Sequence, residues 1–544
     1  MAFSSYELIL SLLFLLASAK LIQYKRNRPS RIVPLRGPPN ENFLLGLTPK
    51  LLSALDRGSY YESWANEYGS IYKVPTAFGG NRIVLCDPKA FAHFHAKDTF
   101  TYSQMPFSRN FLVKFFGQNM LSTEKDDHRR QRRAMAPAFS NAALRRATSV
   151  FYDSAYKLKT YWDAQFESQS EVVIDVQKWM NRITLDSIGI AGFGHDFHSL
   201  DGHQSAVIDA FNSFGATNQG LLSRLQIVIG PIIPSVLNIP TQRARLFSQL
   251  ATNVNKIALE LLERTREESK GEDSGDLKDK SIIGLLIKGE SPDTNFKLLH
   301  QEVMGHINLF LLAGTLTYLM LEKSLLKSML NIHTVSLTWC LYELARNPDK
   351  QQKLREELSS FNTSDPTWDE LTSGIPYLDA VVHETLRIHP PVEEITRMAA
   401  EDDVVPLSAP ITIATGEIVD TIMIPKGTMV TSPLMYINRS DQFWGPDAKR
   451  FIPERWLEEH KGPAKDFHGH RHLYTFSDGP RICLGKGFAL AEFKAVLSVL
   501  IRNFSYEMLE GTNTEIELHT SILPRPKLKG EMSASFPMRV RRVE

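Results

Sequence analysis

Residues 476–487 read FSDGPRICLGKG, a stretch that places one cysteine, Cys483, just before an apolar helical segment. The start of a helix favours a thiolate, because free backbone amides and the helix dipole stabilise negative charge there. Glycines at positions 479 and 485 let the backbone approach a bulky planar group, and Arg481 can pair with an anionic substituent. A lone thiol is more often a buried structural residue, so the surrounding spacing is what indicates a ligand-binding loop.

The spacing Phe-x-x-Gly-x-Arg-x-Cys-x-Gly, from Phe476 to Gly485, is similar to the haem-binding signature of the cytochrome P450 family. The resemblance implies a mainly α fold with a minor β region, with haem b as cofactor and Cys483 as the proximal thiolate ligand of its iron. It also implies that Phe476, Gly479, Arg481 and Gly485 contact the cofactor. Among members of the family, the chain resembles membrane-anchored microsomal enzymes and fungal enzymes of secondary metabolism.

Two further motifs predict a structural ion triad. Glu384 and Arg387, within VHETLRIHPP at residues 382–391, lie three residues apart and share one face of a helix. Taken alone, such a pair could be an exposed ion pair of little importance for stability. However, FIPERW at residues 451–456 follows at the distance where the family places its second arginine-bearing motif. The resemblance therefore implies that Glu384, Arg387 and Arg455 form a buried triad around the cysteine loop.

A basic helix at residues 128–133, HRRQRR, resembles the family's helix with an aromatic residue four positions before an arginine. His128 stands where tryptophan is commoner; either ring can donate a hydrogen bond to a haem propionate, and Arg132 can pair with that group. Arg397 resembles another propionate contact. The remaining arginines are either a solvated helix face or a docking surface for the acidic face of NADPH-cytochrome P450 reductase.

The distal motif departs from the family, which uses a long helix with an Ala-Gly-x-Asp/Glu-Thr pattern. FLLAG at residues 310–314 begins the pattern and TVSLTW at 334–339 can resume it, but Thr315 to His333 intervenes. No acid–threonine pair follows Gly314. Three explanations stay open: the insert is looped out of a working monooxygenase, the chain translates unspliced sequence, or the enzyme does not activate dioxygen. Two functions other than monooxygenation therefore stay open. The chain could be a haem-thiolate isomerase or dehydratase, or an inactive haem-binding pseudoenzyme.

The amino terminus predicts a membrane anchor. Residues from Leu8 to Ala19 are apolar or small, and basic residues follow this run, so the remaining chain is expected on the cytoplasmic side. We therefore expect an anchor at 1–24, a basic and proline-rich hinge at 25–40 and one catalytic domain at 41–544, held at the endoplasmic reticulum membrane by a single pass. A cleaved signal peptide, as in a secreted binding protein, is the competing reading.

The composition argues against a nucleic-acid-binding protein and against a disulfide-rich protein. The 544 residues carry 62 basic and 61 acidic side chains, which gives no global field for nucleic-acid binding. Only three cysteines occur, so a disulfide framework is not expected.

Strand signals gather at Tyr72 to Cys86, and Asn347-Pro348 supplies a cap and a first-turn proline for a helix through Leu358. The apolar segment Ile227–Ile239 is either core or a surface that dips into lipid.

The expected reaction follows from the resemblance. A haem-thiolate monooxygenase inserts one oxygen atom from O₂ into a C–H bond, with electrons from NADPH delivered by the reductase. The substrate should be an apolar small molecule, such as a terpenoid, steroid, fatty acid or aromatic metabolite. Residues Phe107 to Phe116 are a candidate contact region, although aromatic residues of this kind are more often part of the core.

Overall fold

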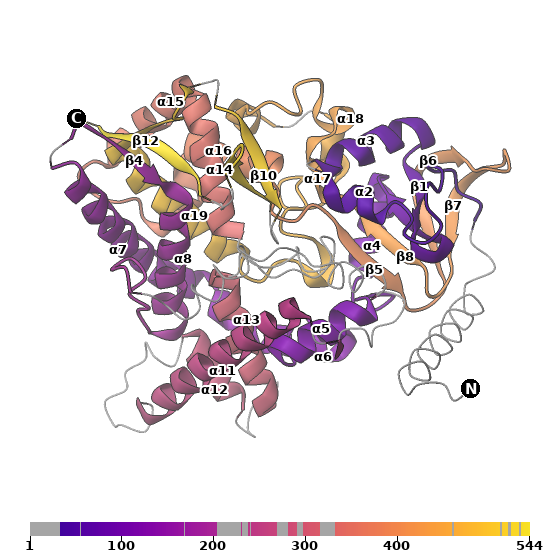
Figure 1. The fold of residues 1–544 in the computed structure, drawn as a ribbon, viewed down its shortest axis with the longest axis horizontal. Helices are drawn as coiled ribbons and strands as arrows, with labels where there is room; N and C mark the ends of the chain where they lie inside the picture. Colours follow the sequence, from indigo (N-terminus) through magenta and orange to yellow (C-terminus); the bar gives the residue numbers. More distant parts are fainter. Residues whose placement is uncertain are drawn as a thin grey trace, which may run out of the picture.

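Figure 1 shows the fold in a computed structural model, which describes residues 33–543 except Leu55, Ser168, 204–229, 231–237, Pro240, 269–280, 291–296, 316–331, 460–461, 512–513, 521–523 and 532–534. The predicted anchor at 1–24, most of the segment Ile227–Ile239 and most of the interruption Thr315–His333 lie outside the described residues. Within the described part, none of the helices combines the length and the apolar character that a bilayer span requires.

Helices form the larger part of the described chain, as the sequence predicts. Their bounds are α2 Thr48–Ser53, α3 Arg57–Tyr68, α4 Pro88–Ala96, α5 Pro106–Phe116, α6 Lys125–Met135, α7 Asn141–Gln165, α8 Val176–Phe193, α11 Gln242–Glu268, α12 Ile282–Gly289, α13 His300–Thr315, α14 Ile332–Arg346, α15 Pro348–Leu358, α16 Pro376–Ile388, α17 Leu434–Arg439, α18 Asp441–Trp444 and α19 Lys486–Asn503.

The strands form small sheets. Their bounds are β1 Ile71–Thr76, β2 Gly80–Leu85, β3 Tyr102–Ser103, β4 Glu171–Asp175, β5 Ile395–Ala399, β6 Asp403–Thr412, β7 Ile418–Ile424, β8 Met429–Ser432, β9 Phe504–Glu507, β10 Ile516–Thr520, β11 Pro524–Leu528 and β12 Pro537–Arg542. The largest sheet has the order β1-β2-β8-β5-β3, in which β2 and β8 run parallel and the other neighbours antiparallel. The predicted strand signals at Tyr72 to Cys86 thus become the hairpin β1–β2.

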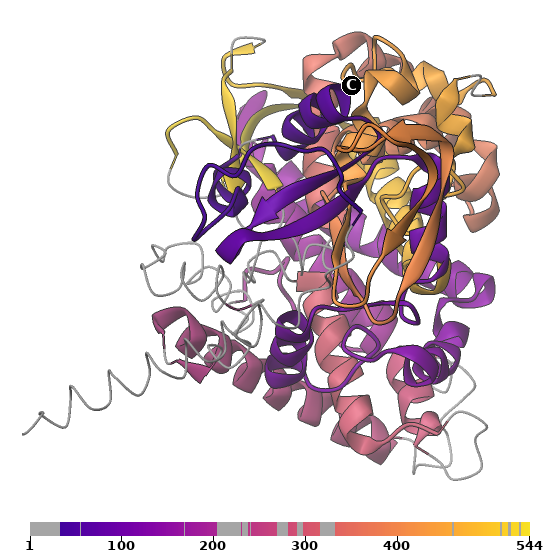
Figure 2. The same cartoon turned by 90° about the vertical axis from the view of Figure 1, so that its right-hand side faces the viewer.

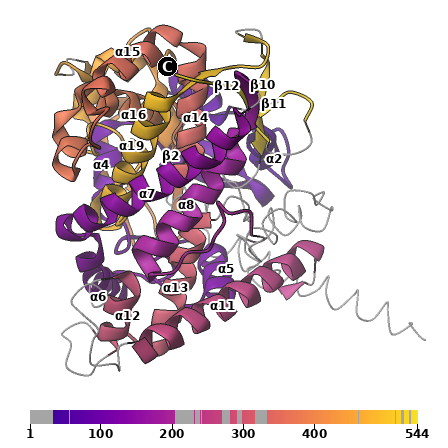
Figure 3. The ribbon, with the colours of Figure 1, turned by 90° about the vertical axis from the view of Figure 1, so that its left-hand side faces the viewer.

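The described chain has two hydrophobic cores that meet around the cysteine loop. One core lies among the helices, including α7, α8, α14, α16 and α19, which Figure 3 shows from the helical side. The other lies between the five-stranded sheet and the helices α3 and α4, on the side that Figure 2 shows. This division separates a helical part from a mixed part, with segments from both reaching the functional site.

Helix α19 fixes the carboxyl side of the cysteine loop. Its residues from Phe488 to Ile501 are buried on nearly every face, apart from a half-buried Leu490, which is typical of a helix in the centre of a large domain. It packs against α7, α14, α15 and α16 (Figure 3). The half-buried loop that precedes this helix is therefore fixed to the helical part at its carboxyl end.

The predicted start of α15 is confirmed, but its cap differs from the prediction. The helix begins at Pro348, yet the Asn347 side chain makes no capping bond to it. Instead, the Asn347 amide donates a 2.7 Å hydrogen bond to the carbonyl oxygen of Glu343 in the preceding helix. The side chain thus completes the end of α14, because the carbonyls in a last helical turn also lack intrahelical donors.

Candidate functional site

The cysteine loop is closed by its own backbone. The N–H of Cys483 donates a 2.8 Å hydrogen bond to the carbonyl oxygen of Phe476, whose side chain is buried. Between them lies the short 3₁₀ turn η9 (Gly479–Arg481), and Gly485 is the residue that precedes the first turn of α19. The loop thereby presents the cysteine at the start of a buried helix, as the sequence predicts.

The protein alone does not supply a stable thiolate at this position. Burial raises the pKa of the Cys483 thiol, although the backbone N–H of Gly485 and the cations Arg132 and Lys486 lower it in part. The stabilisation expected from the helix start is present, but desolvation outweighs it. A metal ion bound to the sulfur supplies the missing stabilisation, because a coordinating thiol loses its proton.

The two predicted glycines meet different requirements. Gly479 has φ +64°, and a β-carbon there would lie 2.2 Å from the carbonyl oxygen of His95 in α4. Its lack of a side chain is therefore needed for packing of the loop on α4, which the sequence does not indicate. Around Gly485 the nearest atom to a β-carbon belongs to Phe139, at 3.8 Å, so this position leaves space beside the cysteine.

Helix α6 points two unsatisfied polar groups toward the loop. His128 is buried, and its Nε2 has no hydrogen-bond partner among the described residues. Burial lowers the pKa of His128 to about 3, with smaller contributions from Arg481 and Arg132, so the ring is neutral at physiological pH. Arg132, one turn further along α6, interacts electrostatically with Cys483, and its guanidinium makes no hydrogen bond or ion pair in the described part.

Arg397 and Arg481 converge on a carboxylate that the sequence analysis missed. Asp98 is fully buried and accepts hydrogen bonds from Arg397 at 2.9 and 3.1 Å, and Arg481 lies 3.5 Å from it. Arg481 also donates to Glu124 at 2.7 Å. Burial would raise the pKa of Asp98, but the two arginines hold it below its usual value. A single aspartate three hundred residues away carries no local sequence signal.

The residues around Cys483 fit a planar cofactor with carboxylate substituents. Within the described residues, the side chains of His128 and Arg132 have unfilled hydrogen-bonding capacity, whereas Arg397 and Arg481 are already paired with the carboxylates of Asp98 and Glu124. The buried Nε of Arg481 nevertheless makes no hydrogen bond to a described residue, although it lies 3.5 Å from Asp98. Three arginines face two carboxylates here, which leaves excess positive charge for an anionic group. His128 and Arg132 are thus better candidates for propionate contacts than Arg397 and Arg481. The sequence alone did not rank these residues.

The structure brings Glu384, Arg387 and Arg455 together. Arg387 donates two hydrogen bonds of 2.8 Å to Glu384, and both side chains are fully buried. Arg455, from the short 3₁₀ helix η7 (Pro453–Trp456), donates to the same carboxylate at 3.0 Å. Arg387 also reaches the backbone carbonyls of Asn438 and Ala448, so the triad ties α16 to two downstream segments.

Glu384 is satisfied well beyond its two arginine partners. The backbone N–H of Ile452 and the indole of Trp456 both donate to it at 2.9 Å. Burial would raise the pKa of Glu384, but Arg387, Arg455 and the Ile452 amide together hold it below its usual value. A fully buried carboxylate therefore stays ionised because every oxygen lone pair faces a donor.

A histidine network connects α16 to the cysteine loop and was not predicted. The Nε2 atoms of His383 and His470 lie 3.2 Å apart, and Nδ1 of His470 lies 3.4 Å from the ammonium of Lys486. His383 in turn contacts Asp379, which pairs with Lys494 at 2.6 Å. The alternating histidines of HGHRH at residues 468–472 were the available signal for this network.

The basic residues of α6 divide between packing and surface. Arg130 donates to Glu302 in α13 at 2.6 and 2.9 Å, and Glu302 is buried, so this arginine links two helices. Arg129 is half-exposed and pairs with Asp126 at 3.0 Å. Because Arg130 is paired with Glu302, the candidate residues for the predicted docking surface on α6 are Arg129 and Arg133.

The distal side is described only as far as the ends of α13 and α14. The ring of Phe310 in α13 lies 5.7 Å from that of Phe139, which is the residue beside Gly485. His306, one turn earlier, is fully buried, with an Nε2 that has no partner among the described residues. Residues 316–331, which hold most of the interruption, are outside the described part.

Aromatic side chains of α5 form a packed layer. Phe107, Phe111, Phe115 and Phe116 are buried, and the rings of Phe111 and Phe115 lie 5.1 and 5.3 Å from Phe247 of α11. The aromatic residues of the predicted contact region Phe107–Phe116 thus belong to the hydrophobic core.

Comparisons with known proteins agree with this geometry. A family model described as Cytochrome P450 matches residues 36–533. The chain is 50% identical to cytochrome P450 monooxygenase claQ of Ampulloclitocybe clavipes, over 99% of this chain and 98% of that protein. It is 33% identical to cytochrome P450 monooxygenase 205 of Postia placenta, over 93% of this chain and 91% of that protein. It is also 31% identical to a ganoderic acid synthetase of Ganoderma lucidum, over 88% of each chain.

Proposed function

Because the chain belongs to the cytochrome P450 family and is a haem-dependent monooxygenase, we propose that it inserts one oxygen atom from O₂ into an apolar secondary metabolite of the terpenoid type. Electrons come from NADPH through NADPH-cytochrome P450 reductase. The proposal includes a membrane anchor at 1–24, a hinge at 25–40 and a catalytic domain at 41–544 on the cytoplasmic face of the endoplasmic reticulum.

The observation that carries the proposal is the position of Cys483 beside the unsatisfied groups of α6. Bound haem supplies dioxygen activation through its thiolate-ligated iron. Cys483 would be the proximal ligand, and His128 and Arg132 would hold the propionates. Gly485 and Lys486 would stabilise negative charge on the sulfur, since both lower the pKa of the thiol. The Glu384 triad would keep the loop in place without touching the cofactor.

Two observations support an apolar substrate. The aromatic layer of α5 and α11 offers large apolar side chains, and an apolar wall excludes water from the reacting molecule. One relative is named for the synthesis of ganoderic acid, which is a terpenoid. An anchored enzyme would also take such molecules directly from the bilayer.

Isotope labelling tests the reaction. The full-length chain in microsomes with the reductase would receive NADPH, ¹⁸O₂ and a panel of terpenoid substrates. We expect a product with one ¹⁸O atom, whose formation stops when NADPH or reductase is withheld. Turnover of a hydroperoxide without either would instead establish the isomerase reaction.

A cysteine substitution tests the cofactor ligand. Reduced, carbon monoxide-treated enzyme should show the red-shifted Soret band of a thiolate-ligated haem, and Cys483→Ala should lose it. Cys340→Ala is the matched control, because Cys340 is a buried free thiol in α14 outside the loop. A Soret band that persists in Cys483→Ala would refute the ligand assignment.

A further inference from the structure

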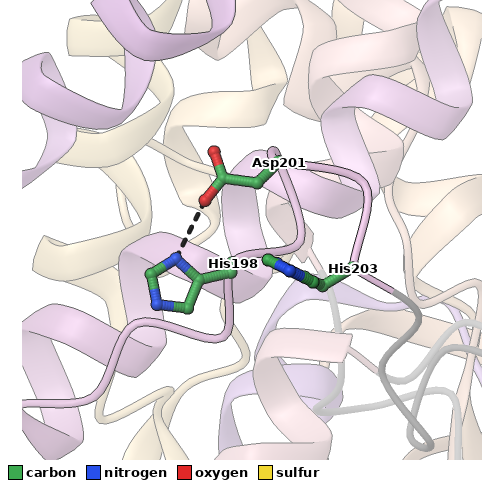
Figure 4. Close-up of side chains that lie close together, drawn as sticks. All are labelled: His198, Asp201 and His203. Carbon is green, nitrogen blue, oxygen red and sulfur yellow. Dashed lines mark hydrogen bonds and ion pairs between the residues drawn. The ribbon is translucent and has the colours of Figure 1, made fainter.

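The loop after α8 concentrates metal-ligand side chains. It reads GHDFHSLDGH at residues 194–203, with three histidines and two aspartates. His198, Asp201 and His203 are exposed, and their ligand atoms all lie within 4.8 Å of one another. Figure 4 shows the side chains of His198 and Asp201 facing each other, with that of His203 close by. In the part of the chain that the structure describes, this is the one group of three such residues at this spacing.

The carboxylate of Asp201 is held in place by α7. Its Oδ2 lies 2.8 Å from Nδ1 of His198 (Figure 4), while its Oδ1 accepts a 2.5 Å hydrogen bond from the Tyr161 hydroxyl. The ammonium of Lys157 donates to Oδ2 at 3.0 Å. The hydrogen bonds to Tyr161, Lys157 and His198 fix the position of the Asp201 carboxylate on the side of the loop that faces α7.

The two imidazoles complete a mixed nitrogen and oxygen set. The ring centroids of His198 and His203 lie 5.6 Å apart with planes at 75°, so the rings do not stack on each other. Imidazole nitrogens together with a carboxylate oxygen favour zinc and similar transition metals over magnesium or calcium, which prefer oxygen ligands alone. Three protein ligands leave room for water in the remaining position.

We propose that His198, Asp201 and His203 bind one divalent transition-metal ion of the zinc type, in addition to the haem iron. The ion would connect the loop to α7 through Asp201 and Tyr161. Oδ2 of Asp201 would serve as the ligand atom, so the ion and the Lys157 ammonium would compete for it. This competition predicts that removal of the Lys157 charge strengthens metal binding.

A second histidine–carboxylate pair provides a matched control. Nδ1 of His300 lies 2.9 Å from Glu290, and the His300 side chain is 58% exposed, against 55% for His198. The two histidines therefore share exposure and a carboxylate contact. Within the described residues, however, no third ligand joins His300 and Glu290. A substitution of His300 changes surface histidine content without touching the proposed site.

The test uses the full-length holoenzyme without a polyhistidine tag, equilibrated with Zn²⁺. Inductively coupled plasma mass spectrometry should find about one zinc ion per chain. Extended X-ray absorption fine structure at the zinc edge should show two imidazole ligands with bonds of about 2.0 to 2.1 Å. His198→Ala and His203→Ala should each weaken zinc binding by at least about tenfold. His300→Ala should leave it unchanged, and Lys157→Gln should strengthen it.

The carbon monoxide difference spectrum of each variant reports whether the haem domain is folded. Wild-type zinc binding in a folded His198→Ala or His203→Ala variant would overturn the assignment. Loss of zinc from His300→Ala to the same extent would also overturn it, because binding would then follow surface histidines in general. Unchanged or weaker binding in Lys157→Gln would refute Asp201 Oδ2 as the ligand atom.

Discussion

Arg387 donates two parallel hydrogen bonds of 2.8 Å to Glu384, and neither side chain is exposed to solvent. The bidentate geometry matches the planar guanidinium to both carboxylate oxygens. A buried pair of this kind gives little net stability compared with apolar residues, but the loss of one partner leaves an uncompensated charge in the interior.

Glu384→Gln should therefore destabilise the fold strongly. The substitution keeps the shape of the side chain but leaves the buried Arg387 and the partly buried Arg455 without a carboxylate, at a cost of about 3 to 5 kcal/mol. Urea unfolding of the holoenzyme measures the change. Asp126→Asn is the matched control, because Asp126 pairs with Arg129 at the same three-residue spacing but at the surface. That change should cost less than about 1 kcal/mol, and equal effects would contradict the prediction.

Substitution of His128 should weaken haem retention without changing the thiolate spectrum. His128→Phe removes the buried ring nitrogen that has no partner among the described residues, and loss of a hydrogen bond to a charged group costs about 1.5 to 3 kcal/mol. The rate of haem transfer to an excess of apomyoglobin measures retention. His128→Trp restores an N–H donor and should recover much of the loss. A His128→Phe variant that holds haem as tightly as wild type would refute the propionate contact.

Substitution of Gly479 should be more damaging to stability than substitution of Gly485. Gly479→Ala places a β-carbon 2.2 Å from a backbone oxygen at a positive φ, which costs at least about 1 to 3 kcal/mol. Among the described residues beyond its chain neighbours, the nearest to a β-carbon at Gly485 is Phe139, at 3.8 Å. Thermal unfolding of the two holoenzymes compares them directly. A larger drop in melting temperature for Gly485→Ala would show that cofactor contact, rather than packing on α4, governs the loop.

Buried histidines should make the fold sensitive to acid. Burial lowers the pKa of His95, His128 and His470 to about 3, and that of His306 to about 4. In the unfolded chain a histidine has a pKa of about 6.5, as in model peptides. Between these values the unfolded state binds more protons, so stability is fully present above about pH 6.5 and falls as the pH decreases toward 4.

Urea unfolding at several pH values between 7.5 and 5 measures this dependence. Each of the four histidines contributes up to about 1.4 kcal/mol per pH unit within the window. His306→Gln should reduce the slope by up to that amount, because glutamine takes up no proton in this range. An unchanged slope in that variant would contradict the prediction for His306.

The sequence by itself determined the elements whose information is local. The spacing around Cys483 predicted the loop, the three-residue spacing of Glu384 and Arg387 predicted a shared helix face, and Pro348 predicted the start of α15. These features depend on turns and helical periodicity, which neighbouring residues encode. The family and its haem cofactor followed from the same local motifs.

Only the tertiary structure decided which distant groups meet. Asp98 lies between Arg397 and Arg481, and His128 keeps a ring nitrogen without a partner in the described part of the chain, because helices and strands from both cores pack around the cysteine loop. Gly479 is required by the backbone of His95, which belongs to another helix. The balance at Cys483 was also decided there, since desolvation depends on everything that surrounds the sulfur, whereas the helix start depends only on the residues next to it.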